Sequence, residues 1–221
     1  MKIFLNLIKN PKFKMISILT FLLFIYISIC AISYAKSVSN DIAEGVFRLH
    51  VIANSDSDED QNLKYKVRDK LIEYMNSLVP NCSSKEMAML IATEHKEEFK
   101  QIAINTIKEE GYDYTVNINI GNFEFPTKYY GDITLPAGMY DAMRVEIGNA
   151  DGQNWWCVMF PPLCFVDVTS GVVPEESKNE LKNDLSEEEF ALISSEKSQD
   201  IQFKFKLLEF FAHGGITTAK K

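Results

Sequence analysis

The first chemistry to consider is nucleophilic catalysis by a cysteine thiolate beside a histidine. Three cysteines in the body of the chain and three histidines could supply it: Cys82, Cys157, Cys164, His50, His95 and His213. None stands in a local catalytic signature, and the chain has no G-x-S-x-G, phosphate-loop or H-E-x-x-H motif. Catalytic carboxylate pairs are not identifiable either, because 31 acidic residues supply many accidental pairs. A secreted hydrolase of the cell wall or of a peptide, with a Cys/His or carboxylate site, is the alternative function.

A second candidate chemistry is calcium binding by Asp56, Asp58 and Asp60, which stand at alternate positions as the first ligands of a calcium loop do. Such a loop needs glycine at its sixth position and glutamate at its twelfth, where this chain has Gln61 and Val67. A helix start explains the acids better, with Asp58 as N-cap and negative charge at the positive end of the helix dipole. The histidines and cysteines form no zinc spacing. We therefore predict no metal and no other cofactor.

The N-terminus has the order of an export signal. Residues 1–14 carry four lysines and no acid, residues 15–32 carry no charge, and Ser33-Tyr34-Ala35 follows as a small-x-small cleavage site. The uncharged run is also just long enough to span a bilayer. Residues 1–35 are thus either a signal peptide cleaved after Ala35 or a retained signal anchor. Because the lysines should stay in the cytoplasm, the rest of the chain is expected outside it.

Charge limits the partners of the exported part. Cleavage after Ala35 removes four lysines and no acid, which changes the net charge from −8 to −12. This balance argues against nucleic acid and anionic lipid as partners, so we expect membrane contact only through the N-terminal segment. Residues 36–45 are expected to form a linker, residues 46–215 a single extracytoplasmic domain, and residues 216–221 a tail.

The segment 154–165 holds both tryptophans, two cysteines and a double proline. Alternation places Trp155 and Cys157 on one face of a strand and Trp156 on the other. Because both faces are apolar, we expect a central strand that is covered on each side. In the functional interpretation, the turn that follows presents aromatic anchors to a partner.

The same segment contains a candidate disulfide. The prolines cannot continue a central strand and would help turn the chain back, which favours a bond between Cys157 and Cys164. In an oxidising compartment this bond closes a short loop, for which the chain-entropy model gives roughly 2–3 kcal/mol. The alternative is two buried free thiols, and the sequence leaves the redox state of Cys82 open.

Hydrophobic periodicity predicts the elements around this segment. Expected strands cover residues 46–53, 114–120, 125–130 and 139–147, and expected helices cover residues 58–79, 84–110, 186–194 and 203–212. The second helix is expected to break near Thr93, and the third begins with a capping box of Ser186 and Glu189. A strand over residues 201–205 is the alternative to the last helix. The predicted fold is therefore α+β: an antiparallel sheet of four to five strands with helices packed on it, preceded by the N-terminal signal or transmembrane helix.

Three blocks of residues combine into a family signature. They are Arg48-Leu-His-Val-Ile-Ala-Asn-Ser-Asp-Ser57 with Asp60-Gln61 and Lys66-Val-Arg-Asp69, then Phe125-Pro-Thr-Lys128 with Leu135-Pro-Ala-Gly138, and finally Gln153-Asn-Trp-Trp-Cys-Val-Met-Phe-Pro-Pro-Leu-Cys-Phe165. Together they resemble the stage II sporulation protein R family of endospore-forming bacteria. The resemblance covers roughly residues 44–168, and the third block is its most specific part.

The resemblance implies a signal rather than an enzyme. Family members are made in the forespore, exported into the space between the two membranes, and activate a membrane-embedded aspartyl protease of the mother cell. That protease then matures the precursor of the early mother-cell sigma factor. This chain is therefore expected to bind such a protease and to favour its active form by binding that form more tightly.

The candidate contacts with this partner are a polar loop, a rigid turn and two arginines. They are Asn54, Asp56 and Asp58 in the loop, Phe160, Pro161 and Pro162 in the turn, and Arg48 and Arg144. Each arginine could instead pair with an acid on its own sheet.

Overall fold

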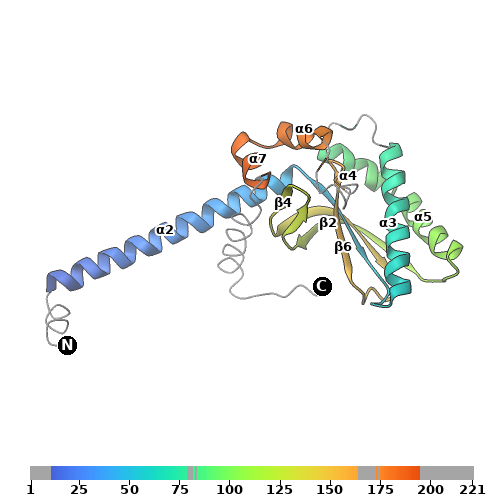
Figure 1. Ribbon diagram of the computed structural model, residues 1–221, viewed down its shortest axis with the longest axis horizontal. Helices are drawn as coiled ribbons and strands as arrows, with labels where there is room; N and C mark the ends of the chain where they lie inside the picture. Colours follow the sequence, from blue (N-terminus) through green and yellow to red (C-terminus); the bar gives the residue numbers. More distant parts are fainter. Residues whose placement is uncertain (1–10, 79–81, 83, 164–172, 174, 195–221) are drawn as a thin grey trace.

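The computed structural model describes residues 11–78, 82, 84–163, 173 and 175–194 (Figure 1). Its helices and strands follow in the order α2 (Pro11–Glu44), β1 (Phe47–Ile52), α3 (Asp58–Leu78), α4 (Lys85–Glu94), α5 (Lys96–Glu109), β2 (Val116–Phe125), β3 (Lys128–Tyr130), β4 (Ile133–Leu135), β5 (Gly138–Ile147), β6 (Asn154–Phe160), α6 (Glu175–Asp184) and α7 (Glu187–Ile193). The predicted α+β class is confirmed. The predicted element at residues 201–212 lies outside the described residues.

The main sheet has four strands in the order β2-β5-β1-β6, and β3 and β4 form a separate hairpin. The sheet is mixed, because β1 pairs with β5 in parallel while the pairs β2–β5 and β1–β6 are antiparallel. The expectation of a purely antiparallel sheet was wrong at this one pairing. Three helices and three strands separate β1 from β5 along the chain, so the chain can re-enter beside β1 in either direction.

One face of the sheet is apolar and packs against α3, α4 and α5. Leu49 and Val51 of β1 and Met143 and Val145 of β5 are fully buried there. Helix α3 contributes Leu63, Val67, Leu71 and Met75, the spacing of which predicted its buried side. Helices α3 and α5 lie side by side at the end of the domain away from α2 (Figure 1).

Strand β6 lies at an edge of the sheet, not at its centre as predicted. The two predicted faces are nevertheless correct: Trp155 meets Tyr65 of α3 on the helix side, and Trp156 stacks on His50 on the other side. From Cys157 onward the strand is buried. Alternation records whether a strand is covered on both faces. It does not tell whether another strand is hydrogen-bonded along each edge. The prediction that β6 is central failed for this reason.

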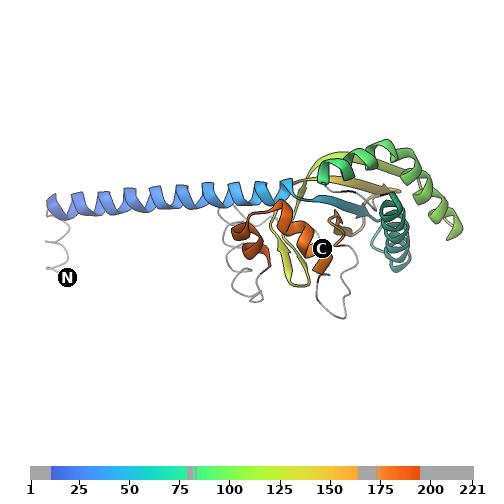
Figure 2. The ribbon, with the colours of Figure 1, turned by 90° about the horizontal axis from the view of Figure 1, so that it is seen from above.

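Helix α2 runs without a break from Pro11 to Glu44, so residues 36–44 are helical and do not form the predicted linker (Figure 2). Val38, Ile42 and Ala43 belong to the core of the domain, and Ile42 is fully buried. Ser39 donates a hydrogen bond to the carbonyl of Ala137 at 3.1 Å. The polar residues between these positions made the segment resemble a linker, because this helix packs only one of its sides against the domain.

Several helix ends show how local side chains define the boundaries. At α3 the N-cap is Ser57, one residue before the predicted Asp58, because the Ser57 hydroxyl accepts the amide of Asp60 at 3.2 Å. At α7 the predicted capping box of Ser186 and Glu189 is confirmed. The predicted break in the second helical stretch falls between α4 and α5.

We predict that Ile42→Ala destabilises the domain by roughly 2–5 kcal/mol, because it removes a buried side chain and leaves a cavity. Denaturant unfolding of the full-length protein in detergent would measure the change. Ile29→Ala serves as the control, since Ile29 is 61% exposed on the same helix, and it should change the stability by less than about 0.5 kcal/mol. Equal effects of the two substitutions would show that residues 36–44 are not part of the core.

Candidate interaction surface

The second face of the sheet is polar and aromatic, in contrast to the face covered by α3–α5. Strand register places His50 of β1 between Arg144 of β5 and Trp156 of β6. Asn119 of β2 follows in the same row and is exposed. This face therefore carries the side chains of the sheet that could perform chemistry.

Arg48, a predicted contact residue, is fully buried on this face. Its guanidinium lies over the rings of Phe125 and Tyr140, at 4.1 and 4.6 Å from their centroids, and donates to the Tyr130 hydroxyl at 2.6 Å. Among the described residues no carboxylate pairs with it, and its Nε and Nη1 have no hydrogen-bond partner. Cation–π contacts stabilise the charge instead. Arg48 thus joins the sheet to the β3–β4 hairpin and is not available to a partner.

His50 is also held inside the domain. Its Nε2 lies 2.7 Å from Asn154 Oδ1, and its ring stacks on Trp156 at a centroid distance of 3.7 Å. Burial lowers the pKa of His50 to about 4, although the hydrogen bond to Asn154 opposes this shift. The imidazole is therefore neutral at pH 7 and acts as a packing group.

Cys157 and His50 cannot form a catalytic pair. Leu49 lies opposite Cys157 and His50 lies opposite Trp156, so alternation turns Cys157 and His50 to opposite faces of the sheet. Cys157 is also disulfide-bonded, which removes the thiolate that a nucleophile needs. Cys30 and Cys82 are thiols, and the predicted partner, Cys164, lies outside the described residues, so the pairing itself stays a prediction.

Arg144 differs from Arg48 because it remains accessible. Its side chain is 35% exposed and pairs with Glu146 of the same strand at 2.6 Å. Its guanidinium lies 5.7 Å from the centroid of Phe123. It therefore pairs with an acid on its own sheet, as one interpretation predicted, and is still within reach of a ligand.

The polar loop after β1 is built as a cap for α3. Asn54 and Ser55 donate to the carboxylate of Asp60 at 2.8 and 2.5 Å, and Asn54 also accepts the amide of Asn149 at 3.0 Å. Burial raises the pKa of Asp60, but the hydrogen bonds from Ser55 and Asn54 outweigh it and leave that pKa lowered. Asn54 thus has a structural role, whereas Asp56 and Asp58 are exposed.

The predicted exposed turn after β6 is largely buried, so this expectation was wrong for two of its three residues. Phe160 is 4% exposed and Pro161 is buried, while Pro162 is half-buried. The Phe160–Pro161 peptide is cis, and the hydroxyl of Ser177 in α6 donates to the Pro162 carbonyl at 3.0 Å. Helix α6 therefore contacts the turn that was expected to face a partner.

A partly exposed group of aromatic and charged residues lies beside the loop, and sequence reasoning missed it. Within it, Arg68 is 18% exposed and pairs with Asp69 at 2.6 Å, and Trp155 is half-buried. The Arg68 guanidinium lies 4.2 Å from the ring centroid of Trp155 and 5.1 Å from that of Tyr65. We call Asp56, Asp58, Tyr65, Arg68 and Trp155 the α3 surface. Arginine and large aromatic residues are the types that dominate protein interfaces. The spacing of Tyr65 and Arg68 indicated one face of α3, but the strand that meets them was not predictable.

Lys64 connects the α3 surface to the interior. Its Nζ donates to Gln61 Oε1 at 2.5 Å and to the carbonyl of Gln153 at 3.1 Å, and the side chain is almost fully buried. Burial, with a smaller contribution from the charge of Arg68, lowers the pKa of Lys64 to about 8, although the charge of Asp56 opposes this shift. Lys64 therefore ties α3 to the backbone that leads into β6.

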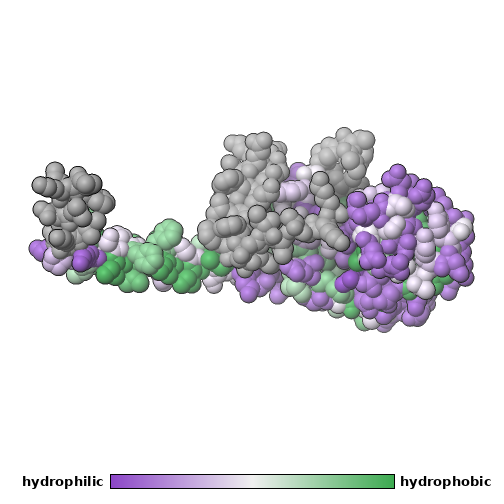
Figure 3. Space-filling view, turned by 90° about the horizontal axis from the view of Figure 1, so that it is seen from below, coloured by the Kyte–Doolittle hydropathy of each residue, from purple (hydrophilic) through white to green (hydrophobic). Residues whose placement is uncertain are grey.

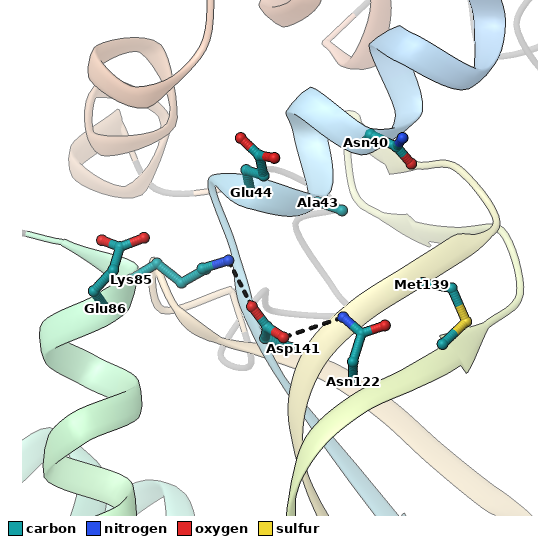
Figure 4. A pocket seen from close by; sticks show the side chains of 8 residues that line it. All are labelled: Asn40, Ala43, Glu44, Lys85, Glu86, Asn122, Met139 and Asp141. Atoms are coloured by element: carbon teal, nitrogen blue, oxygen red, sulfur yellow. Dashed lines mark hydrogen bonds and ion pairs between the residues drawn. The ribbon is translucent and has the colours of Figure 1, made fainter. Parts of the chain in front are cut away.

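A cavity of about 490 Å³ lies where α2 enters the domain (Figure 4). Its wall contains the ion pair of Lys85 and Asp141 at 2.7 Å, and Asn122 donates to the same carboxylate at 3.1 Å. Burial raises the pKa of Asp141, but these two partners reverse the shift. The pair joins α4 to β5. Within the described residues, no group of three or more metal-ligating side chains is positioned to hold an ion.

Comparison with known proteins identifies the class to which this fold and these surfaces belong. The model of the stage II sporulation protein R family matches residues 43–170. The chain belongs to this family, as the three sequence blocks predicted, and has a sporulation-related role. A curated relative, "Stage II sporulation protein R" of Bacillus subtilis (strain 168), is 40% identical over 138 residues. The matched part covers 62% of this chain and 62% of that relative, and no solved structure matches.

We predict that His50 makes the domain lose stability as the pH falls from 6.5 to 4. The unfolded chain takes up this proton near pH 6.5, whereas the folded protein takes it up only near pH 4. Stability is therefore complete above pH 6.5 and falls by up to roughly 3 kcal/mol by pH 4. Urea unfolding at a series of pH values would measure this slope.

The matched variant is His50→Gln, which keeps an amide donor toward Asn154. It should lose the slope between pH 6.5 and 4 and keep the acid sensitivity of Asp60 and Asp141, whose pKa values are lowered. An unchanged slope in this variant would show that His50 does not titrate in this way.

Proposed function

We propose that this chain is an exported signalling protein that activates a membrane-embedded aspartyl protease of the mother cell and so triggers maturation of the early mother-cell sigma factor. The forespore makes and exports it in this proposal, and the domain acts in the space between the two membranes. Membership of the stage II sporulation protein R family supports this function, since the sequence blocks that define the family also imply this pathway.

The observation that carries the proposal is the contrast between α2 and the domain. Among the described residues, α2 is the helix that is long and apolar enough to cross a membrane. Figure 3 shows a hydrophobic band along α2 and a largely hydrophilic surface on the domain. This is the build of a protein that enters an export pathway and presents a water-soluble domain beyond the membrane.

The state of the domain's reactive groups favours binding over catalysis. His50 is neutral and stacked, Arg48 is enclosed by aromatic rings, and Cys157 is in a disulfide. Each of these groups is buried and makes its contacts inside the domain. The hydrolase alternative therefore gains no support from the Cys/His arrangement that motivated it.

The α3 surface is the part of the domain best suited to contact the protease. It begins in the loop after Ile52, at the opposite end of β1 from the junction with α2. A partner can therefore reach it without contacting the membrane that α2 would enter. Arg68 and Trp155 supply a cation and a large apolar area side by side, and Asp56 and Asp58 add exposed charge.

The function is tested by reconstitution. Lipid vesicles that contain the protease and the precursor sigma factor are incubated with or without this protein, and precursor cleavage is followed by gel electrophoresis. We expect cleavage only when the protein is present. Cleavage at the same rate in its absence would refute the proposal, and activation by His50→Gln at the wild-type level would exclude a catalytic imidazole.

We predict that Asp56→Lys with Asp58→Lys reduces precursor cleavage at least tenfold while the domain stays folded. The substitutions would place like charges opposite each other in an interface whose charges were complementary, and this weakens binding strongly. Glu94→Lys with Glu97→Lys is the matched control, since both residues are exposed and Glu97, like Asp58, lies in the first turn of a helix. The same assay measures both variants. Wild-type activity of the loop variant would remove Asp56 and Asp58 from the interface.

A further inference from the structure

The sequence Ser33-Tyr34-Ala35, the predicted cleavage site, lies inside the unbroken helix α2. Val38, which is three residues beyond Ala35, is already packed into the core of the domain. The bond between Ala35 and Lys36 is therefore next to a folded structure on its C-terminal side. A signal peptide joined to its domain by a flexible linker would not have this geometry.

Residues 36–44 are held by both packing and hydrogen bonding. Ile42 is fully buried and Val38 and Ala43 are nearly so, while the Ser39 hydroxyl donates to the Ala137 carbonyl. The contact at Ser39 is close: a Cβ added to Gly138 would lie 3.1 Å from Ser39 Oγ. This end of α2 therefore packs closely against the start of β5.

Helix geometry couples this docking to the bond after Ala35. In an α-helix the carbonyl of residue 35 accepts the amide of residue 39, and residue 39 is itself anchored to the domain. A protease binds its substrate as an extended chain, so the bond is accessible only when this helical turn opens. The rate of cleavage of a folded protein then follows the population of the opened form.

We propose that docking of residues 36–44 on the domain protects the Ala35–Lys36 bond, so that folding and cleavage by signal peptidase compete. In the cleavage, water adds across this amide bond, Ala35 receives the carboxylate and Lys36 receives the free amine. A chain that is cleaved before docking is released as a soluble domain. A chain that docks first keeps α2 and stays anchored.

Two insertions of equal length between Ala35 and Lys36 separate docking from other effects. An eight-residue Gly-Ser insertion interrupts the helix and frees the bond, whereas an eight-residue Ala-Glu-Lys insertion continues the helix. Both leave the cleavage site at the same distance from the apolar segment and every core residue unchanged. Purified full-length proteins in detergent are incubated with a bacterial signal peptidase, and the products are identified by mass spectrometry.

We expect cleavage after Ala35 at least tenfold faster in the Gly-Ser variant than in the wild type, with the Ala-Glu-Lys variant close to the wild type and all three melting at the same temperature. Equal rates in the wild type and the Gly-Ser variant would overturn the proposal. Resistance of the Gly-Ser variant would overturn it as well, because the bond would then not be a cleavage site. The outcome is independent of protease activation.

Discussion

Strand β1 lies between β5 and β6, and all six of its side chains are buried although two of them, Arg48 and His50, are polar. Burying a cation without a partner is costly, so the surrounding structure must compensate for Arg48. Phe125, Tyr130 and Tyr140 do so by enclosing the guanidinium. These rings come from β2, from the hairpin and from the start of β5, so all three elements meet around Arg48 of β1.

This central constraint also determines how the buried polar residues Arg48 and His50 are used. The hydrogen bonds and ring contacts of these two residues are directed inward, and His50 remains neutral because it is buried. A partly exposed cation and aromatic ring lie side by side elsewhere, at Arg68 and Trp155. A domain built in this way has a stable interior and a small number of exposed side chains suited to recognition.

Helix α2 joins its apolar segment, which is long enough to cross a membrane, to this domain without a flexible joint. Since Ile42 belongs to the same core as β1, a displacement of the apolar part of the helix would reach the domain through direct packing. The proposed export and anchoring through α2 are therefore physically linked to the folding of the domain, in a chain whose proposed task is to carry a signal between two cells.

Features that depend on neighbouring residues were predictable from the sequence: the buried side of α3, the capping box of Ser186 and Glu189, the two faces around Trp155 and Trp156, and the blocks that identify the family. The parallel pairing of β1 with β5, the edge position of β6, the docking of residues 36–44, and the burial of Arg48 and Phe160 became visible only in the folded chain. The two groups differ in how far apart the interacting residues lie in the sequence. Periodicity and caps arise within a few residues, whereas pairing and burial depend on contacts between segments far apart in the chain, and for these a single sequence carries no direct signal.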